Sequence, residues 1–268
     1  MRTPDSKEHW TETLFVKHPE LFLPWMDSMK QYAAGESEGL RKIFEKYKLR
    51  QGSRILDLQS GIGRISINLA KAGFQIAGVD ISPFYLGLAK KWAIKENLGD
   101  RVRFYKVDSR NLEASLKKTP EFDAVINIGT SMGYFDEKND IRMFRSARNL
   151  TRPHGLLVIE TVNRDALIKN FHPQSTLRSD NIEWHEDRKL NLETSRMENI
   201  WRFYKITGHS LRLVSELPMS HRVYSLHELK HLVEKTGWKY QESYSSLRDL
   251  TPPTTDSFHI TIVAQNKS

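Results

Sequence analysis

The sequence predicts an α/β fold with a mostly parallel sheet, and three observations lead to this expectation. Short apolar runs, such as residues 53–58 and 74–80, have the length and composition of buried strands. A helical pattern begins at Ile65 after the first run, and another, opened by Ser82 and Pro83, follows the second. The 268 residues leave room for one α/β domain and an insertion. Strands that are joined through helices run parallel to one another.

The remaining elements continue the alternation of strands and helices. Apolar residues interrupted by prolines predict helices between residues 8 and 50, ahead of the first strand. A glycine ends the last expected helix, as is common at helix C-termini. Later strands are expected at residues 101–108, 122–128, 155–162, 238–246 and 256–265, and later helices at 137–150 and 226–235.

Composition excludes several classes of protein. The chain is 38% hydrophobic and 28% charged, and no apolar run approaches the roughly 20 residues that span a bilayer. The polar N-terminus lacks the apolar core of a secretory signal, so we expect a cytoplasmic protein without a membrane partner. Cysteine is absent, which excludes disulfides, cysteine-based zinc sites and thiolate nucleophiles. No set of Asp, Glu and His with ligand spacing stands out, so we expect no metal.

The charge balance raises the question of an anionic partner. The formal net charge is +8, which is compatible with RNA or a phosphorylated metabolite. The basic residues are scattered, however, and no run of five Lys or Arg occurs. A solvated basic surface therefore explains the charge better, and RNA stays an alternative that is not favoured.

The stretch from residue 53 to 64, SRILDLQSGIGR, organises the chain. It reads as a buried strand, a tight turn with Gly61 and Gly63, and the start of a helix. Such a unit brings backbone N–H groups and a helix N-terminus to a ligand. The next strand ends on Asp80, 23 positions after Asp57 (80 − 57), and a carboxylate there suits a ribose diol.

Two nucleotide-type ligands are compatible with this unit. The dinucleotide fingerprint G-x-G-x-x-G fails, because its third glycine falls on Ser66 or, in the other frame, on Arg64. The pattern D-x-x-x-G-x-G with a following acidic strand end fits directly. It resembles the class I S-adenosylmethionine (SAM)-dependent methyltransferases, whose usual wording is close to LDLGCGTGR. Gln59 replaces the family's first glycine and Ser60 its cysteine, so Gln59 would either crowd or hydrogen-bond the methionine portion of SAM.

The resemblance covers nearly the whole chain from residue 50 onward and implies its architecture. It implies a Rossmann-like, seven-stranded, mostly parallel sheet with an antiparallel last strand. The SAM-binding domain would comprise residues 51–162 and 225–268, and residues 1–50 would form a helical lid. Residues 163–224, after the fifth strand, form a segment that is too long to be a loop in a compact domain. Four segments there alternate polar and apolar residues, as half-buried antiparallel strands do, and predict a β-rich insertion for substrate contact or homodimer formation: residues 181–186, 189–194, 199–206 and 210–217.

The resemblance also implies which residues hold SAM. Asp80 would bind the ribose, Asp108 with Ser109 the adenine edge, and Ile81 one adenine face. Asn127, at the tip of the fourth strand, would face the reactive centre. The full set of expected SAM-binding residues is Asp57, Gln59, Ser60, Gly61, Gly63, Asp80, Ile81, Asp108, Ser109 and Asn127.

Methyl transfer from SAM depends mainly on alignment, and a general base is optional. If a base is used, we expect His221, Tyr224 or Tyr134, of which histidine is the only one that titrates near neutral pH. The loop at residues 130–135 carries S-x-G-Y, which resembles small-molecule N-methyltransferases acting on glycine or amino sugars. The N-P-P-Y motif of base-modifying enzymes is absent from the end of the fourth strand.

The resulting hypothesis is an enzyme that moves a methyl group from SAM to nitrogen or oxygen of a small molecule, with S-adenosylhomocysteine as the other product. The alternatives are a methyltransferase acting on tRNA or rRNA, and a SAM-binding protein without transfer chemistry. Aminopropyl transfer from decarboxylated SAM is a more distant alternative.

Overall fold

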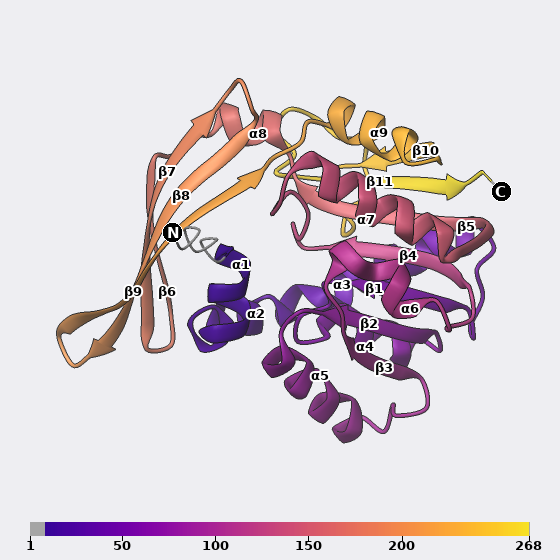
Figure 1. Ribbon diagram of the computed structural model, residues 1–268, viewed down its shortest axis with the longest axis horizontal. Coiled ribbons are helices and arrows are strands. Elements are labelled where there is room, and N and C mark those ends of the chain that lie inside the picture. The colour runs from indigo at the N-terminus through magenta and orange to yellow at the C-terminus, as the bar shows by residue number, and fades with distance from the viewer. Residues whose placement is uncertain (1–8, 268) are drawn as a thin grey trace, which may run out of the picture.

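The computed structural model describes residues 9–267, which form two sheets with helices around them (Figure 1). The larger sheet has seven strands in the order β10-β11-β5-β4-β1-β2-β3. β11 is antiparallel to both of its neighbours, and the other adjacent pairs are parallel. The expected Rossmann-like sheet with an antiparallel last strand is therefore confirmed. Its strands are β1 (Arg54–Leu58), β2 (Gln75–Asp80), β3 (Val102–Lys106), β4 (Phe122–Ile128), β5 (Thr151–Val162), β10 (Trp238–Tyr244) and β11 (His259–Asn266).

Helices cover both faces of this sheet, because successive strand residues point to opposite faces and both faces are apolar. One hydrophobic cluster joins the sheet to α3, α4 and α5, and a second joins it to α6, α7 and α9. The helices around the sheet are α3 (Lys30–Lys46), α4 (Arg64–Lys71), α5 (Pro83–Lys95), η3 (Ser109–Asn111), α6 (Leu112–Leu116), α7 (Glu137–Asn149) and α9 (Leu226–Lys235).

The predicted insertion is a four-stranded antiparallel sheet in the order β6-β7-β8-β9. Its strands are assigned differently from the expectation. Residues 181–186 and 189–194 belong largely to one strand, because Asp187 and Arg188 continue the ladder between β7 and β8. The insertion also contains β6, a strand that the sequence did not predict because Leu177 is its only large apolar residue. The insertion consists of α8 (Arg164–Lys169), β6 (Gln174–Ser179), β7 (Ile182–Asn191), β8 (Arg196–Thr207) and β9 (Ser210–Arg222).

The N-terminal segment lies between the two sheets (Figure 1). Trp10, Leu14 and Leu21 form one apolar cluster with residues of β7, β8 and β9, such as Trp184 and Phe203. This segment therefore packs mainly on the insertion, whereas α3 packs on α4 beside the larger sheet. That it acts as a lid stays a prediction. The segment comprises α1 (Trp10–Glu12), the π-helix η1 (Thr13–Lys17), η2 (Pro19–Leu21) and α2 (Leu23–Ser28).

Within residues 9–267, no helix combines the length and the apolar character needed to cross a membrane.

Candidate active site

The turn between β1 and α4 brings backbone close to the space above the sheet. Gly61 and Gly63 have φ values of +55° and +81°, in the left-handed region that favours glycine. A Cβ atom on Gly61 would lie 2.3 Å from Cε of Met26, and one on Gly63 would lie 2.9 Å from the ring of Phe104. Glycine is therefore needed both for the turn and for the close packing around it.

Gln59 stands where the family has its first glycine, and its side chain does not fill the space above the turn. It adopts a φ of +55°, and its side-chain oxygen accepts a hydrogen bond of 2.7 Å from Nδ2 of Asn127. Asn127 thus lies beneath Gln59 at the end of β4 and holds its amide in place. The oxygen Oδ1 of Asn127 and the hydroxyl of Ser60 are buried and make no hydrogen bond within the described part of the chain.

Two buried carboxylates, Asp57 and Asp80, lie at the carboxyl ends of β1 and β2. Asp80 accepts hydrogen bonds from the backbone N–H groups of Gly61, at 2.9 Å, and Ser82, at 2.8 Å. Ser66 donates to Asp57 over 2.5 Å. Burial raises the pKa of Asp57 to about 7, and the negative charge of Asp80 adds to this rise. Burial also raises the pKa of Asp80.

Asp108, the third expected acidic strand end, already has a partner. Its side chain accepts from the backbone N–H of Arg110 at 2.9 Å and forms an ion pair with the Arg110 guanidinium at 2.5 Å. Burial would raise the pKa of Asp108, but the hydrogen bonds and charge of Arg110 outweigh it and lower that pKa. Any adenine contact to this carboxylate must therefore use the lone pairs that Arg110 leaves free.

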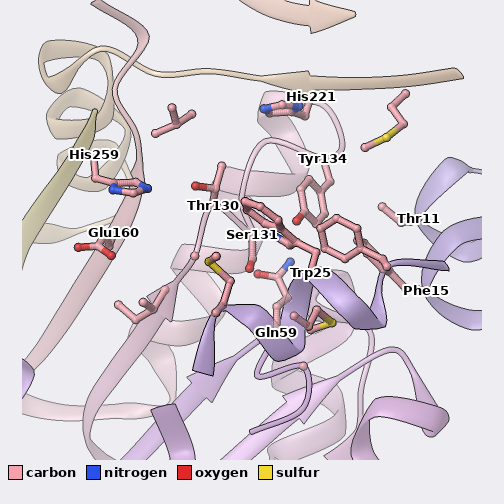
Figure 2. A pocket seen from close by; sticks show the side chains of 18 of the residues that line it. Thr11, Phe15, Trp25, Gln59, Thr130, Ser131, Tyr134, Glu160, His221 and His259 are labelled. Carbon is pink, nitrogen blue, oxygen red and sulfur yellow. The ribbon is translucent and has the colours of Figure 1, made fainter. Parts of the chain in front are cut away.

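A cavity of about 750 Å³ lies above these strand ends, between the larger sheet, the N-terminal segment and the insertion (Figure 2). Aromatic side chains of the N-terminal segment, among them Phe15, Phe22 and Trp25, form much of its wall. A volume of this size lies in the range that accommodates a cofactor-sized ligand. The expected site residues that line it are Asp57, Gln59, Ser60, Gly61, Asp80, Ile81, Asp108, Ser109, Tyr134 and His221.

Three expected site residues are not among those that line the cavity. Gly63 is buried behind the turn as the N-cap of α4, and Asn127 reaches the cavity only through Gln59. Tyr224 is buried in the core, where its hydroxyl donates a hydrogen bond of 2.6 Å to Asp140. In this structure the hydroxyl of Tyr224 is therefore held by a buried carboxylate and does not face the cavity, and a role for Tyr224 as a base stays a prediction.

His221 and Tyr134 do face the cavity, from β9 and from the loop after β4 (Figure 2). Burial lowers the pKa of His221 to about 4, and the nearby charge of Arg196 lowers it further. His221 is therefore neutral at pH 7 and offers a lone pair on one ring nitrogen. Burial raises the pKa of Tyr134, so its hydroxyl stays protonated. The ring of Tyr134 packs edge-on against Trp10 at 4.8 Å.

Sequence reasoning missed several charged or titratable residues in the cavity wall, among them the following four. Glu160 lies at the end of β5, His259 begins β11, and Arg64 of α4 forms an ion pair with Glu36 of α3. Glu160 is 4% exposed and is the only charged residue in the buried run 156–162, an available signal that was not used. Arg64 and Glu36 lie in helical patterns of ordinary composition and gave no signal.

The residues present fit SAM. The glycine turn leaves backbone accessible, carboxylates line the end of the cavity where the ribose is expected, and the buried hydroxyl of Ser60, which lines the cavity, lacks a partner among the described residues. Such buried polar atoms cost free energy unless a ligand or water satisfies them. Among residues 9–267, no cluster of three or more His, Asp or Glu could hold a metal ion.

Comparisons with known proteins agree with this geometry. The chain is 26% identical over 220 residues to YqeM of Bacillus subtilis, a protein with a provisional methyltransferase name, covering 81% of this chain and 85% of that one. It is 28% identical over 152 residues to a glycine/sarcosine N-methyltransferase of Halorhodospira halochloris, covering 56% of this chain and 55% of that enzyme.

Solved structures share the fold at low identity. A SAM-dependent methyltransferase from Clostridium acetobutylicum superposes with a TM-score of 0.74 at 15% identity, covering 87% of this chain and 92% of that one. A SAM-bound amino pentose methyltransferase from Micromonospora echinaspora gives 0.62 at 16% identity, covering 87% and 91%. The sequence model of the methyltransferase domain family matches residues 49–235. This chain therefore belongs to the methyltransferase domain family and is a class I SAM-dependent methyltransferase.

Proposed function

We propose that this enzyme transfers the methyl group of SAM to nitrogen or oxygen of a small molecule. The observation that carries the proposal is the aromatic, mostly apolar wall of the cavity. Its SAM-binding end lies over β1 and β2, and the rest is roofed by aromatic residues of the N-terminal segment and by β7, β8 and β9. A mostly apolar cavity of this size suits a small acceptor. The glycine/sarcosine N-methyltransferase among the relatives supports the same class of substrate.

The role of the chain in this reaction is to bind, orient and exclude water. SAM supplies an electrophilic methyl on a sulfonium; the acceptor's lone pair forms the new bond to carbon while the S–C electron pair stays on sulfur. Asp80 is proposed to hold the ribose, and the turn at Gln59–Gly63 the methionine part. Trp25, Phe15 and Tyr134 keep water from the reacting end of the cavity. His221, neutral and facing the cavity, is proposed to accept a hydrogen bond from the acceptor.

A labelling experiment tests the proposal. The protein is incubated with methyl-labelled SAM and a fractionated cell extract, and the label is followed into small molecules, RNA and protein. We expect label in the small-molecule fraction, lost in Asp80→Asn and retained in Asp100→Asn, a change in an exposed loop. Label in RNA would favour the RNA alternative, and tight SAM binding without any transfer would favour a SAM-binding protein. Formation of a homodimer through the insertion stays a prediction, which light scattering would check.

A further inference from the structure

Two residues that the proposed function does not use, Glu160 and His259, lie side by side at one end of the cavity (Figure 2). Glu160 is paired with Ile128 of β4 on one side and with Thr261 of β11 on the other. His259 stands at the start of β11, opposite Val162. Because β11 is antiparallel, its beginning meets the carboxyl ends of β4 and β5. Both side chains therefore lie on the sheet edge that carries the SAM site, beyond β4 from β1 and β2.

The carboxylate of Glu160 is held rigidly by one of its oxygens. Oε2 accepts hydrogen bonds from the backbone N–H of Leu247, at 2.7 Å, and from the hydroxyl of Thr261, at 3.1 Å. Within the described part of the chain, no donor hydrogen-bonds to Oε1. Since Glu160 lines the cavity, this second oxygen is the one available to a ligand.

Glu160 is buried, whereas the nearby ion pair of Glu36 with Arg64 is partly exposed and is neutral as a pair. Glu36 and Glu160 contribute two carboxylates, and Arg64, which is paired with Glu36, contributes one guanidinium. Arg248 also lines the cavity and lies close enough for its charge to lower the pKa of His259, but it is exposed and lies over the ring of Tyr32 at 4.8 Å. Among the described residues Glu160 forms no ion pair, so its buried carboxylate favours a positively charged ligand group.

His259 adds a second hydrogen-bond acceptor to this end of the cavity. Burial lowers the pKa of His259, as do the charges of Arg248 and Arg64, whereas the charge of Glu160 opposes them. The neutral ring has a nitrogen with a free lone pair. Glu160 Oε1 and a His259 nitrogen together match a group that carries several N–H donors and a positive charge, which is what an ammonium group offers.

We propose that Glu160 and His259 form the binding site for a protonated amino group of the acceptor, so that the acceptor is a small amine. This inference rests on the proposed function and names its substrate class. The proposal concerns how that amino group is held. Phe171 and Phe258 also line the cavity and offer apolar contact to the body of such a molecule.

The test uses three probes that share a ring and differ in charge: benzylamine, benzyl alcohol and phenylacetate. Their binding to the full-length protein saturated with S-adenosylhomocysteine is measured at pH 7 by ligand-observed NMR titration. We expect benzylamine to bind at least about tenfold more tightly than either other probe, since one charge-assisted hydrogen bond accounts for that ratio. Glu160→Gln should remove the preference, and His259→Asn should reduce it.

Matched controls separate this role from a structural one. Glutamine at residue 160 keeps an oxygen for Leu247 and Thr261, so the melting temperature and the S-adenosylhomocysteine affinity should stay at wild-type values. Glu234→Gln and His231→Asn make the same chemical changes at exposed positions of α9 and should retain the preference for benzylamine.

The possible outcomes distinguish this inference from the proposed function. Equal binding of the three probes, no binding of any probe, or a preference that survives Glu160→Gln would each overturn the amine site. If the wild-type protein fails to bind S-adenosylhomocysteine in calorimetry, the proposed function fails as well. If S-adenosylhomocysteine binds and the preference for the amine is absent, only the amine site fails.

Discussion

The SAM end and the acceptor end that we propose for the cavity are built in different ways. At the SAM end, Asp57, Gln59 and Gly61 are close neighbours in the sequence, and Asp80 follows one βα unit later. The proposed acceptor end combines the N-terminal segment, the loop after β4, the insertion and β11, which are as much as 249 residues apart (259 − 10, from Trp10 to His259). A local motif therefore identifies the cofactor, whereas the acceptor depends on contacts that only the folded chain makes.

The two ends of the cavity also differ in whether their buried polar groups are charged or neutral. Carboxylates at the SAM end are buried at a cost in stability, as the raised pKa values of Asp57 and Asp80 indicate. At the acceptor end, the raised pKa of Tyr134 and the lowered pKa of His221 leave both groups neutral inside an aromatic wall. Affinity for SAM is thus expected to depend on a few fixed charges. Changes to the acceptor end should leave that affinity largely intact.

The largest expected effect is the pH-dependent loss of folding stability that the buried Asp57 causes. Because its folded-state pKa is raised to about 7, the folded protein keeps a proton that the unfolded chain loses above about pH 4. The stability contributed by this proton is full below that pH and is lost as the pH rises through 7. Asp57→Asn should therefore gain about 4 kcal/mol relative to wild type between pH 4 and pH 8.

Urea unfolding of both proteins across this pH range measures the effect of Asp57. Asp100→Asn, at an exposed position, should follow the wild-type curve. Parallel curves for Asp57→Asn and wild type would mean that burial at the SAM end carries no such cost.

The next effect concerns the ribose. Asp80→Ala removes a buried carboxylate that the Gly61 and Ser82 amides hold in place, and should weaken SAM binding by about 1–3 kcal/mol. Isothermal titration calorimetry measures the change, with the exposed-loop variant Asp100→Asn as control. Unchanged affinity would refute the assignment of Asp80 to the ribose.

A smaller effect is expected from the glycine turn. Gly61→Ala places a side chain at a φ of +55° and close to Met26, which should destabilise the protein by about 1–2 kcal/mol and weaken SAM binding. Gly87→Ala in α5 meets no atom within 4 Å and should stabilise the helix by about 0.5–1 kcal/mol. Thermal unfolding and calorimetry compare the two variants. Similar behaviour of both would show that the close approach at Gly61 is not needed.

The smallest expected effect is that of Tyr224→Phe, which tests whether Tyr224 acts in the cavity. Tyr224→Phe removes the donor to the buried Asp140 and should lower the free energy of unfolding by about 1–2 kcal/mol. Because Tyr224 does not line the cavity, the affinity for S-adenosylhomocysteine and the transfer rate per folded molecule should stay at wild-type values. A loss of transfer at normal stability would support the role in catalysis that the sequence suggested.

Local patterns explain which parts of the fold could be predicted. β4 was expected at residues 122–128 and α9 at 226–235, and the structure has the same bounds. In α9, Ser225 and Glu228 form a capping box, so the start of the helix is encoded within four residues. β6 was missed because an exposed, largely polar edge strand has little apolar pattern of its own.

The candidate site also divides into residues that a local sequence motif predicts and residues that only the folded chain brings together. Asp80, Gly61 and Ser109 were placed by a motif and do line the cavity. Tyr224 lies three residues after His221, an odd spacing that would place the two side chains on opposite faces of a strand, and β9 ends at Arg222. The pairing of strands far apart in sequence, which no single-sequence pattern reveals, is what brings Glu160 beside His259.

The apolar cluster that joins the N-terminal segment to β7, β8 and β9 also constrains how the chain folds during synthesis. Trp10 and Leu14 leave the ribosome long before their partners Leu217 and Met219 have been made. These side chains remain without their final partners until roughly 200 more residues have been translated, because contacts of such long sequence separation form late. We therefore expect the cavity wall that the N-terminal segment shares with the insertion to form late in folding.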